Sequence, residues 1–143
     1  MNREAIYSGL FDKLSSIPGL KTKSRILKHW TDVKAEQQPA LFMAQVSETA
    51  QTVTGQPTKW KLQVSIYLYV QTSGGKVPGT VLNPIIDSIS DITNFVHPVT
   101  GKNTLGLESL GVDWCRIEGT INTDEGTLGQ QSVAIIPITI LVS

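Results

Sequence analysis

The segment Thr58–Gln71 (TKWKLQVSIYLYVQ) constrains the fold more than any other, because apolar and polar or amphipathic side chains alternate along it. Side chains of a β-strand point alternately to its two faces, so this period predicts a strand with one dry face. Burying the apolar side chains would contribute roughly 1.5–3 kcal/mol each, and fixing about a dozen backbones costs roughly 1–2 kcal/mol apiece. The strand therefore requires a sheet beside it and a layer over it. The apolar positions are Trp60, Leu62, Val64, Ile66, Leu68 and Val70, and those between them are Lys61, Gln63, Ser65, Tyr67 and Tyr69.

Length and composition restrict the classes of protein. A chain of 143 residues predicts one domain spanning residues 1–143, and its 12 basic and 12 acidic residues cancel, which argues against a general nucleic-acid binder. The single cysteine, Cys115, can form no disulfide within the chain and offers no zinc-ligand spacing. The N-terminus lacks the apolar core of a signal peptide, and no run of about 18 apolar residues predicts a membrane span. We expect a soluble, intracellular protein.

Helical periodicity occurs in two segments. Asn2–Ser16 predicts an amphipathic helix with Asn2 as its N-cap, ended by Pro18-Gly19. Thr80–Phe95 predicts a second helix, which we expect to begin near Asn83 because Pro84 is tolerated only in a first turn. The stripe of this second helix comprises Leu82, Ile85, Ile86, Ile89, Ile92 and Phe95.

The remaining segments alternate between strands and loops. We predict further strands at Lys23–Trp30, Leu41–Val46, Val112–Asn122 and Ser132–Val142, and a turn at Thr123–Gly126. Polar segments predict connections at Thr31–Pro39, Ser47–Pro57, Thr72–Gly79 and His97–Gly106. Pro137 complicates its strand, because proline cannot donate to a ladder. The order α-β-β-β-α-β-β predicts an α+β fold, with an antiparallel-rich mixed sheet of about five strands flanked by the two helices.

No group of residues predicts catalysis. His29 and His97 lack metal-binding neighbours and are interpreted as edge and loop residues, and Cys115 as a buried strand residue. Ser73-Gly74-Gly75-Lys76 lacks the spacing of a phosphate loop and is interpreted as a turn. Asp124 and Glu125 are interpreted as a solvated hairpin tip. We therefore predict no enzyme activity, no catalytic residue, no metal and no cofactor.

One face of the central strand does combine basic and aromatic side chains. Lys59, Lys61, Tyr67 and Tyr69 resemble a nucleic-acid-binding face only weakly, because no run of basic residues supports them. A core without reactive groups instead carries three long polar loops, at Ser47–Pro57, Thr72–Gly79 and His97–Gly106. Loops longer than about 12 residues are uncommon unless functional, and these three approach that length, which favours a protein that works through contacts.

The chain resembles the tail terminator, or tail completion, proteins of long-tailed bacteriophages along nearly its whole length. The resemblance lies in the N-terminal helix, the central alternating strand up to Ile66-Tyr67, the second helix and Gly126. It also lies in the motifs Pro39-Ala40-Leu41-Phe42, Pro57-Thr58-Lys59-Trp60-Lys61-Leu62, Arg116-Ile117-Glu118-Gly119-Thr120-Ile121 and Ala134-Ile135-Ile136-Pro137-Ile138.

This resemblance implies a structural virion protein at the head-proximal end of the tail, assembled in the host cytoplasm. Such a protein forms a homohexameric ring through heterologous interfaces. The ring caps the tail tube, ends its polymerisation and provides a surface for head–tail joining. Its implied partners are its own copies, the tail tube protein and the head–tail connector protein. It implies no enzyme activity, no cofactor and no membrane, and DNA passes through the ring without specific recognition.

Two sets of residues are candidate contacts in such a ring. Lys61, Tyr67 and Tyr69 share the outward face of the central strand and are candidates for the subunit interface, since tyrosine is favoured at interfaces. The candidate contacts with the tube or connector lie in two loops: Thr54, Gly55 and Gln56 in the first, and Asp124, Glu125 and Gly126 in the second.

Two alternatives stay open. One is a head–tail connector or another minor tail or baseplate component, and the other is a small-molecule-binding module or an enzyme with unrecognised residues. The lack of a convergent titratable cluster separates the terminator from the last class. The oligomeric state would separate them further.

Overall fold

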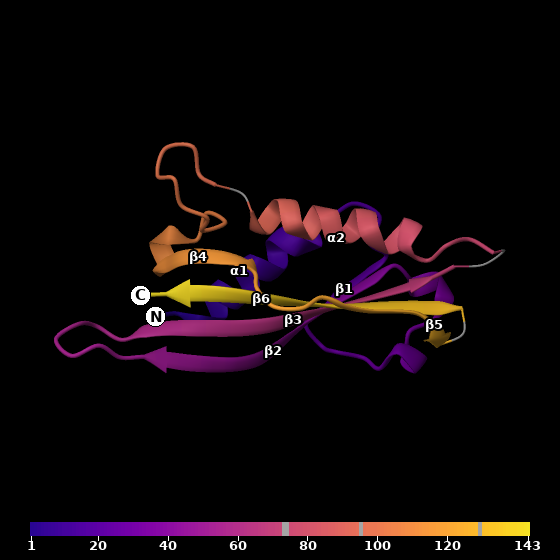
Figure 1. The fold of residues 1–143 in the computed structure, drawn as a ribbon, viewed down its shortest axis with the longest axis horizontal. Coiled ribbons are helices and arrows are strands. Elements are labelled where there is room, and N and C mark those ends of the chain that lie inside the picture. The colour runs from indigo at the N-terminus through magenta and orange to yellow at the C-terminus, as the bar shows by residue number, and fades with distance from the viewer. Residues whose placement is uncertain (73–74, 95, 129) are drawn as a thin grey trace.

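The computed structural model describes residues 1–72, 75–94, 96–128 and 130–143 (Figure 1). Two helices accompany one curved, six-stranded sheet, so the predicted α+β class is confirmed. The helices are α1 (Arg3–Ser15) and α2 (Gly79–Thr93), with single 3-10 turns at Trp30–Asp32, Ala35–Gln37 and Glu108–Leu110. The strands are β1 (Thr22–Ser24), β2 (Ala40–Gln51), β3 (Lys59–Gln71), β4 (Val112–Ile117), β5 (Asn122–Leu128) and β6 (Gln131–Val142).

The predicted central strand, β3, lies in the middle of the sheet. It pairs antiparallel with β2 on one side, from Lys59 to Tyr69, and with β6 on the other, from Trp60 to Gln71. The sheet order is β1-β2-β3-β6-β4, with β5 also paired to β6, and only the β1–β2 pair is parallel. The prediction of an antiparallel-rich mixed sheet is thus confirmed.

The alternation along β3 separates two cores. Its even-numbered side chains from Leu62 to Val70 are buried with apolar residues of both helices, so the helices cover this face, as predicted. Figure 1 shows α1 and α2 near each other against the sheet. The odd-numbered face carries a smaller core of Val33, Ala40, Phe42, Tyr69 and Val133, covered by the segment around residues 30–38. We call the face of the sheet opposite the helices the open face.

The two helices begin differently. In α1, the Asn2 side chain accepts a hydrogen bond from the Ala5 N–H at 3.1 Å, so the predicted N-cap is confirmed. The predicted start of α2 near Asn83 is wrong, because the helix begins at Gly79 and contains Pro84 in its interior. Hydrogen bonds from the N–H groups of Thr80, Val81 and Leu82 to the carbonyls of residues 77 and 78 form this earlier first turn. Predicted Phe95 lies outside the described residues, as do Ser73 and Gly74.

The sequence predictions for residues 23–30, 47–51 and 123–126 are wrong. The strand predicted over residues 23–30 ends at Ser24, whose hydroxyl accepts from the Ile26 N–H at 2.9 Å and so competes with the ladder. Residues 47–51, predicted as loop, belong to β2, because β3 provides pairing partners beyond a bulge at Val46. The predicted turn at residues 123–126 lies inside β5, where Thr123 and Asp124 pair with Ala134 and Val133.

Pro137 lies in β6 at the point where β4 stops and β5 has not begun. Ile117 of β4 pairs with Ile138, and Asn122 of β5 pairs with Ile135. The Pro137 carbonyl accepts the Glu118 N–H at 3.2 Å, so the nitrogen without a proton also faces this break. The strand predicted over residues 112–122 therefore ends at Ile117, next to the proline, and β5 begins only at Asn122.

Candidate interaction surface

The open face is divided into a covered half and an uncovered half. In the covered half, Tyr69 is 4% exposed and its hydroxyl donates to the Lys28 carbonyl oxygen at 2.7 Å. Its ring lies 5.5 Å from that of Phe42, and burial raises the pKa of Tyr69 above its ordinary value. The chain itself therefore covers Tyr69, which leaves this candidate interface residue little surface for a neighbour.

A hollow of about 480 Å³ remains beside this covered half. Tyr67 is half-buried at its wall, and Asp124 of β5 reaches the same hollow, so the structure brings together two residues that the sequence assigned to different contacts. Aromatic and apolar side chains dominate the lining: Leu27, Lys28, His29, Trp30, Tyr67, Tyr69, Asp124, Val133 and Ile135.

The uncovered half lies at the other end of the same face. Lys61, Leu141 and Trp114 form one row across β3, β6 and β4. The Arg116 guanidinium lies 4.1 Å from the centre of the Trp114 ring, a cation–π arrangement. Trp114 and Leu141 are half-buried, so an apolar floor remains accessible between charged side chains.

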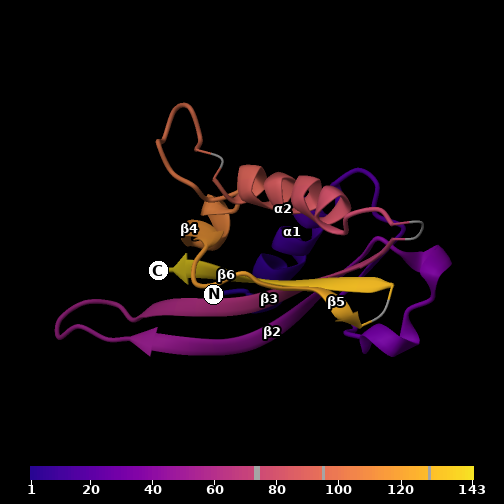
Figure 2. The ribbon, with the colours of Figure 1, turned by 45° about the vertical axis from the view of Figure 1, so that its right-hand side comes forward.

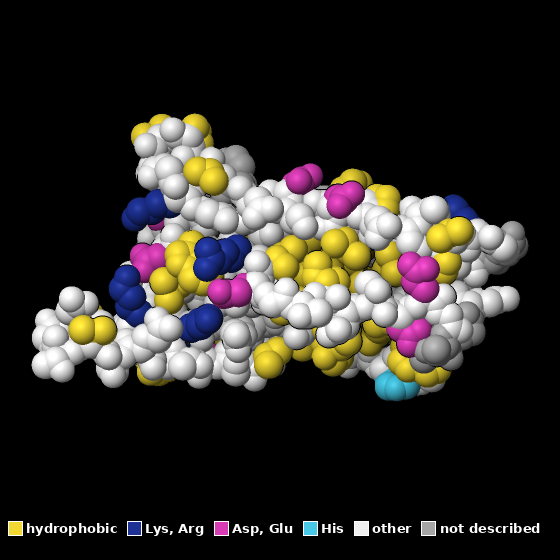
Figure 3. Space-filling view, viewed as in Figure 1, with side chains coloured by type: hydrophobic (Ala, Val, Ile, Leu, Met, Phe, Trp, Pro, Cys, Tyr) yellow, Lys and Arg dark blue, Asp and Glu magenta, His cyan; other side chains and the backbone are white. Residues whose placement is uncertain are grey.

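Ion pairs surround this floor without neutralising it. Glu118 lies 3.7 Å from the Lys61 Nζ and 3.5 Å from the nearest Arg116 nitrogen, while Lys59 pairs with Asp113 at 3.4 Å. Three cations thus face two carboxylates. We define the basic–aromatic patch as Lys59, Lys61, Trp114, Arg116 and Leu141. At the left end of Figure 3, where β4 and the end of β6 lie in Figure 1, hydrophobic side chains are flanked by Lys and Arg.

The patch lies at the end of the molecule from which the β2–β3 turn projects (Figures 1 and 2). Thr54, Gly55 and Gln56 are exposed in that turn, beside Val53, which is 59% exposed. Two hydrogen bonds join β2 to α1: Glu48 of β2 accepts from Arg3 at 2.7 Å and from the Tyr7 hydroxyl at 2.9 Å.

The second predicted contact segment lies elsewhere. Asp124, Glu125 and Gly126 belong to β5, at the opposite end of the sheet from the β2–β3 turn in Figures 1 and 2. The two candidate loops therefore do not form one surface, and residues 124–126 form no hairpin tip.

The residues considered for catalysis do not meet. Cys115 is buried among apolar side chains, which raises the pKa of its thiol to about 12. The His29 side chain accepts the Thr31 N–H at 3.2 Å, and the Nδ1 of His97 accepts the N–H groups of Val99 and Thr100 at 3.1 and 3.2 Å. Both histidines thus hold local turns. Among the described residues, no group of three or more His, Cys, Asp and Glu could hold a metal ion.

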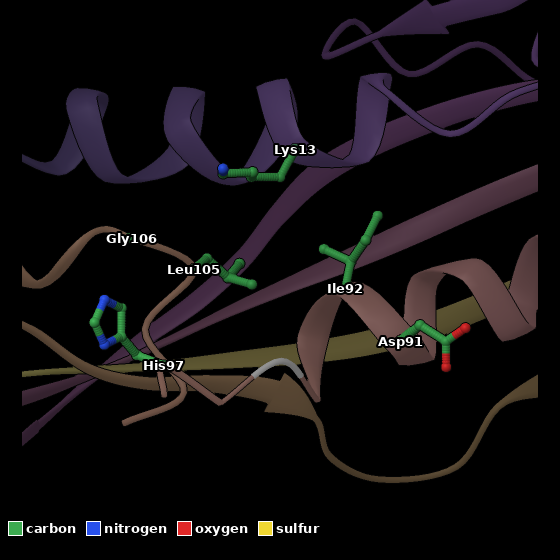
Figure 4. Close-up of a pocket in the computed structure, with 6 residues that line it drawn as sticks. All are labelled: Lys13, Asp91, Ile92, His97, Leu105 and Gly106. Carbon is green, nitrogen blue, oxygen red and sulfur yellow. The ribbon is translucent and has the colours of Figure 1, made fainter. Parts of the chain in front are cut away.

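A second hollow, of about 420 Å³, lies between α1, α2 and the loop of residues 96–106. Its lining comprises Lys13, Asp91, Ile92, His97, Leu105 and Gly106 (Figure 4). In Figure 4 the side chain of Asp91 points away from Lys13 and His97, so the titratable groups do not converge on one reacting atom. The mainly apolar hollow offers space but no arrangement for acid–base chemistry.

Sequence reasoning identified Lys61 but missed Trp114, Arg116 and Leu141. The alternation of Trp114, Cys115 and Arg116 contained the signal, because a buried cysteine places its two neighbours on the opposite face of a strand. Their row with Lys61 depends on the pairing of β4 with β6, which no local pattern indicates.

Comparison with known proteins identifies a fold and nothing more specific. No protein-family model and no curated protein matches the sequence. Among thirty matching chains of known structure, one whose name contains no functional term aligns with 99% of this chain and 92% of its own. Its sequence identity is 14% and its TM-score 0.50, so the likeness concerns the fold alone. None of the described helices is long and apolar enough to span a membrane.

Proposed function

We propose that this chain is a structural virion protein, a tail terminator of a long-tailed bacteriophage. It forms a homohexameric ring on the head-proximal end of the tail tube. The ring ends tube polymerisation and presents a surface to the head–tail connector protein, and DNA passes through it without sequence recognition. The protein assembles in the host cytoplasm and is not an enzyme.

One observation carries this proposal: the open face is uncovered over the basic–aromatic patch. Trp and Arg are enriched at the buried centres of protein interfaces, and here Arg116 stacks on a half-buried Trp114. The resemblance described above, which covers nearly the whole length of the chain, supplies the kind of assembly. The charged side chains of the patch form ion pairs with Asp113 and Glu118.

The first experiment is to determine the oligomeric state of the purified chain. Light scattering after size exclusion should give six times the mass of one chain, and negative-stain images should show rings. Because some rings close only on their partner, the same measurement is repeated with tail tube protein present. A stable monomer in both conditions would exclude the ring.

The second experiment addresses termination itself. Adding the chain to polymerising tail tube protein should shorten the tubes in proportion to its concentration, with density for the chain at one tube end. If it instead binds the sides of the tubes or leaves their lengths unchanged, the terminator function is excluded. Binding to an isolated connector without an effect on tubes would favour the connector alternative.

The hollow beside Tyr67 supports a second candidate function, a small-molecule-binding module. Its volume of about 480 Å³ and its aromatic walls, which include Trp30 and Tyr67, suit a planar organic ligand. A thermal-shift screen with aromatic compounds tests this candidate. Binding that is abolished by Tyr67→Ala and that leaves the chain monomeric would favour it over the ring.

A further inference from the structure

Helix α2 presents a line of acidic side chains to solvent. Asn83, Asp87 and Asp91 recur at intervals of four and are all exposed, so they lie on one side of the helix. The helix, Gly79–Thr93, contains no Lys or Arg. None of the ion pairs among the described residues includes Asp87 or Asp91.

A third carboxylate extends this line beyond the start of the helix. The Oε1 of Glu125 lies 3.1 Å from the position that a Cβ on Gly79 would occupy, and Asn83 borders the same point. Half-buried Ile86 and Ile92 flank the line. We define the acidic ridge as Ile86, Asp87, Asp91, Ile92 and Glu125. Figure 3 shows acidic side chains along the upper edge, where α2 lies in Figure 1.

The basic–aromatic patch has the complementary character. It offers an apolar floor, and its cations exceed the neighbouring carboxylates by one. The side chains of Lys59 and Arg116 are 50% and 51% exposed, so both can turn toward a second molecule. Lys61 and Arg116 share the single carboxylate of Glu118, so its charge is not sufficient to neutralise both cations.

We infer that the acidic ridge of one copy of this chain packs on the basic–aromatic patch of the next. The occupant of the patch is thus a second copy, selected by charge and by the apolar residues on both surfaces. The contact joins two different surfaces, so it is heterologous and, repeated with closure, generates a ring rather than an isolated dimer. The inference rests on the proposed ring and specifies which surfaces form it.

Reversing the charge of each surface separately tests the contact. The patch variant is K59E/R116E and the ridge variant is D87K/D91K, and all four positions are exposed or half-exposed. In each variant, like charges would face each other across the contact, so we expect the dissociation constant of the oligomer to rise at least about tenfold. The control K21E/K34E makes the same charge change as the patch variant, at exposed residues outside both surfaces, and should assemble as the wild type does.

Mixing the two variants is the decisive measurement. The reversed patch of one variant matches the reversed ridge of the other, and their unaltered surfaces also match, so alternating rings should form with a dissociation constant within about threefold of the wild type. Native mass spectrometry identifies such rings by equal numbers of the two chains. Melting temperatures near that of the wild type establish that both variants fold.

Three outcomes overturn the inference and are distinguishable. If both variants form the same rings as the wild type, the proposed function stands but this contact is excluded. Assembly by D87K/D91K alone, with K59E/R116E dissociated, would indicate that the patch meets a surface other than the ridge. A wild-type chain that forms no oligomer, alone or with tube protein, would exclude both the ring and the contact.

Discussion

Substitutions of Tyr69 test whether this side chain contributes to the fold of its own chain or to the contact between subunits. Its ring is 4% exposed and 5.5 Å from that of Phe42, and its hydroxyl donates to the Lys28 carbonyl. Tyr69→Phe removes only this hydrogen bond, which should lower the free energy of unfolding by about 0.5–1.5 kcal/mol. Tyr69→Ala also removes the ring from a packed site, which should cost about 3–5 kcal/mol.

Urea denaturation followed by tryptophan fluorescence measures both changes directly. For a domain of this size, each kcal/mol should shift the melting temperature by roughly 2–5 °C, so Tyr69→Ala should lower it by about 6–25 °C. Tyr67→Phe is the matched control. The described residues provide no hydrogen bond to the Tyr67 hydroxyl, and removing it should leave the free energy of unfolding within about 0.5 kcal/mol of the wild type.

The result that refutes this reasoning concerns Tyr69→Phe. If the urea midpoint of the variant equals that of the wild type while its oligomer dissociates, the hydroxyl serves a neighbouring subunit and not its own chain. If both variants melt as expected and the Tyr69→Phe chain still assembles, Tyr69 contributes to the fold, and the subunit contact must be sought at the uncovered half of the open face.

Three further predictions concern reactivity, pH and backbone conformation. Cys115, whose pKa is raised to about 12 by burial, should resist a thiol reagent at pH 8 and react only at the rate of unfolding, which mass spectrometry can follow. The hydrogen bond from Arg3 lowers the pKa of Glu48 below its unfolded value, so this contribution to stability is present at neutral pH and lost as pH falls from about 4.3 through the lowered pKa. Denaturation of Glu48→Gln should therefore depend less on pH in that range. Gly119 has φ +115° and a Cβ there would lie 3.3 Å from a proline carbon, so Gly119→Ala should destabilise by about 1–3 kcal/mol, whereas Gly126→Ala, which meets open space, should melt as the wild type does.

Local patterns predicted the elements whose stability is decided locally. The alternation along β3 identified both the strand and its buried face, because side-chain direction in a strand follows from residue parity alone. The Asn2 cap and the apolar spacing of α1 were likewise sufficient, since both act within one or two turns of helix.

Segments whose conformation depends on distant partners were predicted wrongly. Gly126 and its polar neighbours indicate a turn by composition, yet Thr123 and Asp124 pair with β6, and this pairing places the segment in a strand. Residues 47–51 have a polar composition typical of a loop but continue β2, because β3 offers a full-length partner beyond the bulge at Val46. Tertiary pairing overrides weak local preference in both cases.

The same distinction explains why the candidate surface was located only in part. Parity placed Lys61, Tyr67 and Tyr69 on one face, but it does not show which part of that face another segment of the chain covers. Strand β1 decides this, because it pairs only with Ala40–Phe42, the part of β2 that lies opposite Tyr69 and Tyr67. The chain that follows β1 consequently crosses this end of the face.

The other end of the open face, around Lys61, has no such covering segment among the described residues. At this end, pairing with β6 and β4 adds Trp114 to the surface. The three-residue parallel pair therefore fixes both the part of the open face buried within one chain and the part available to a second.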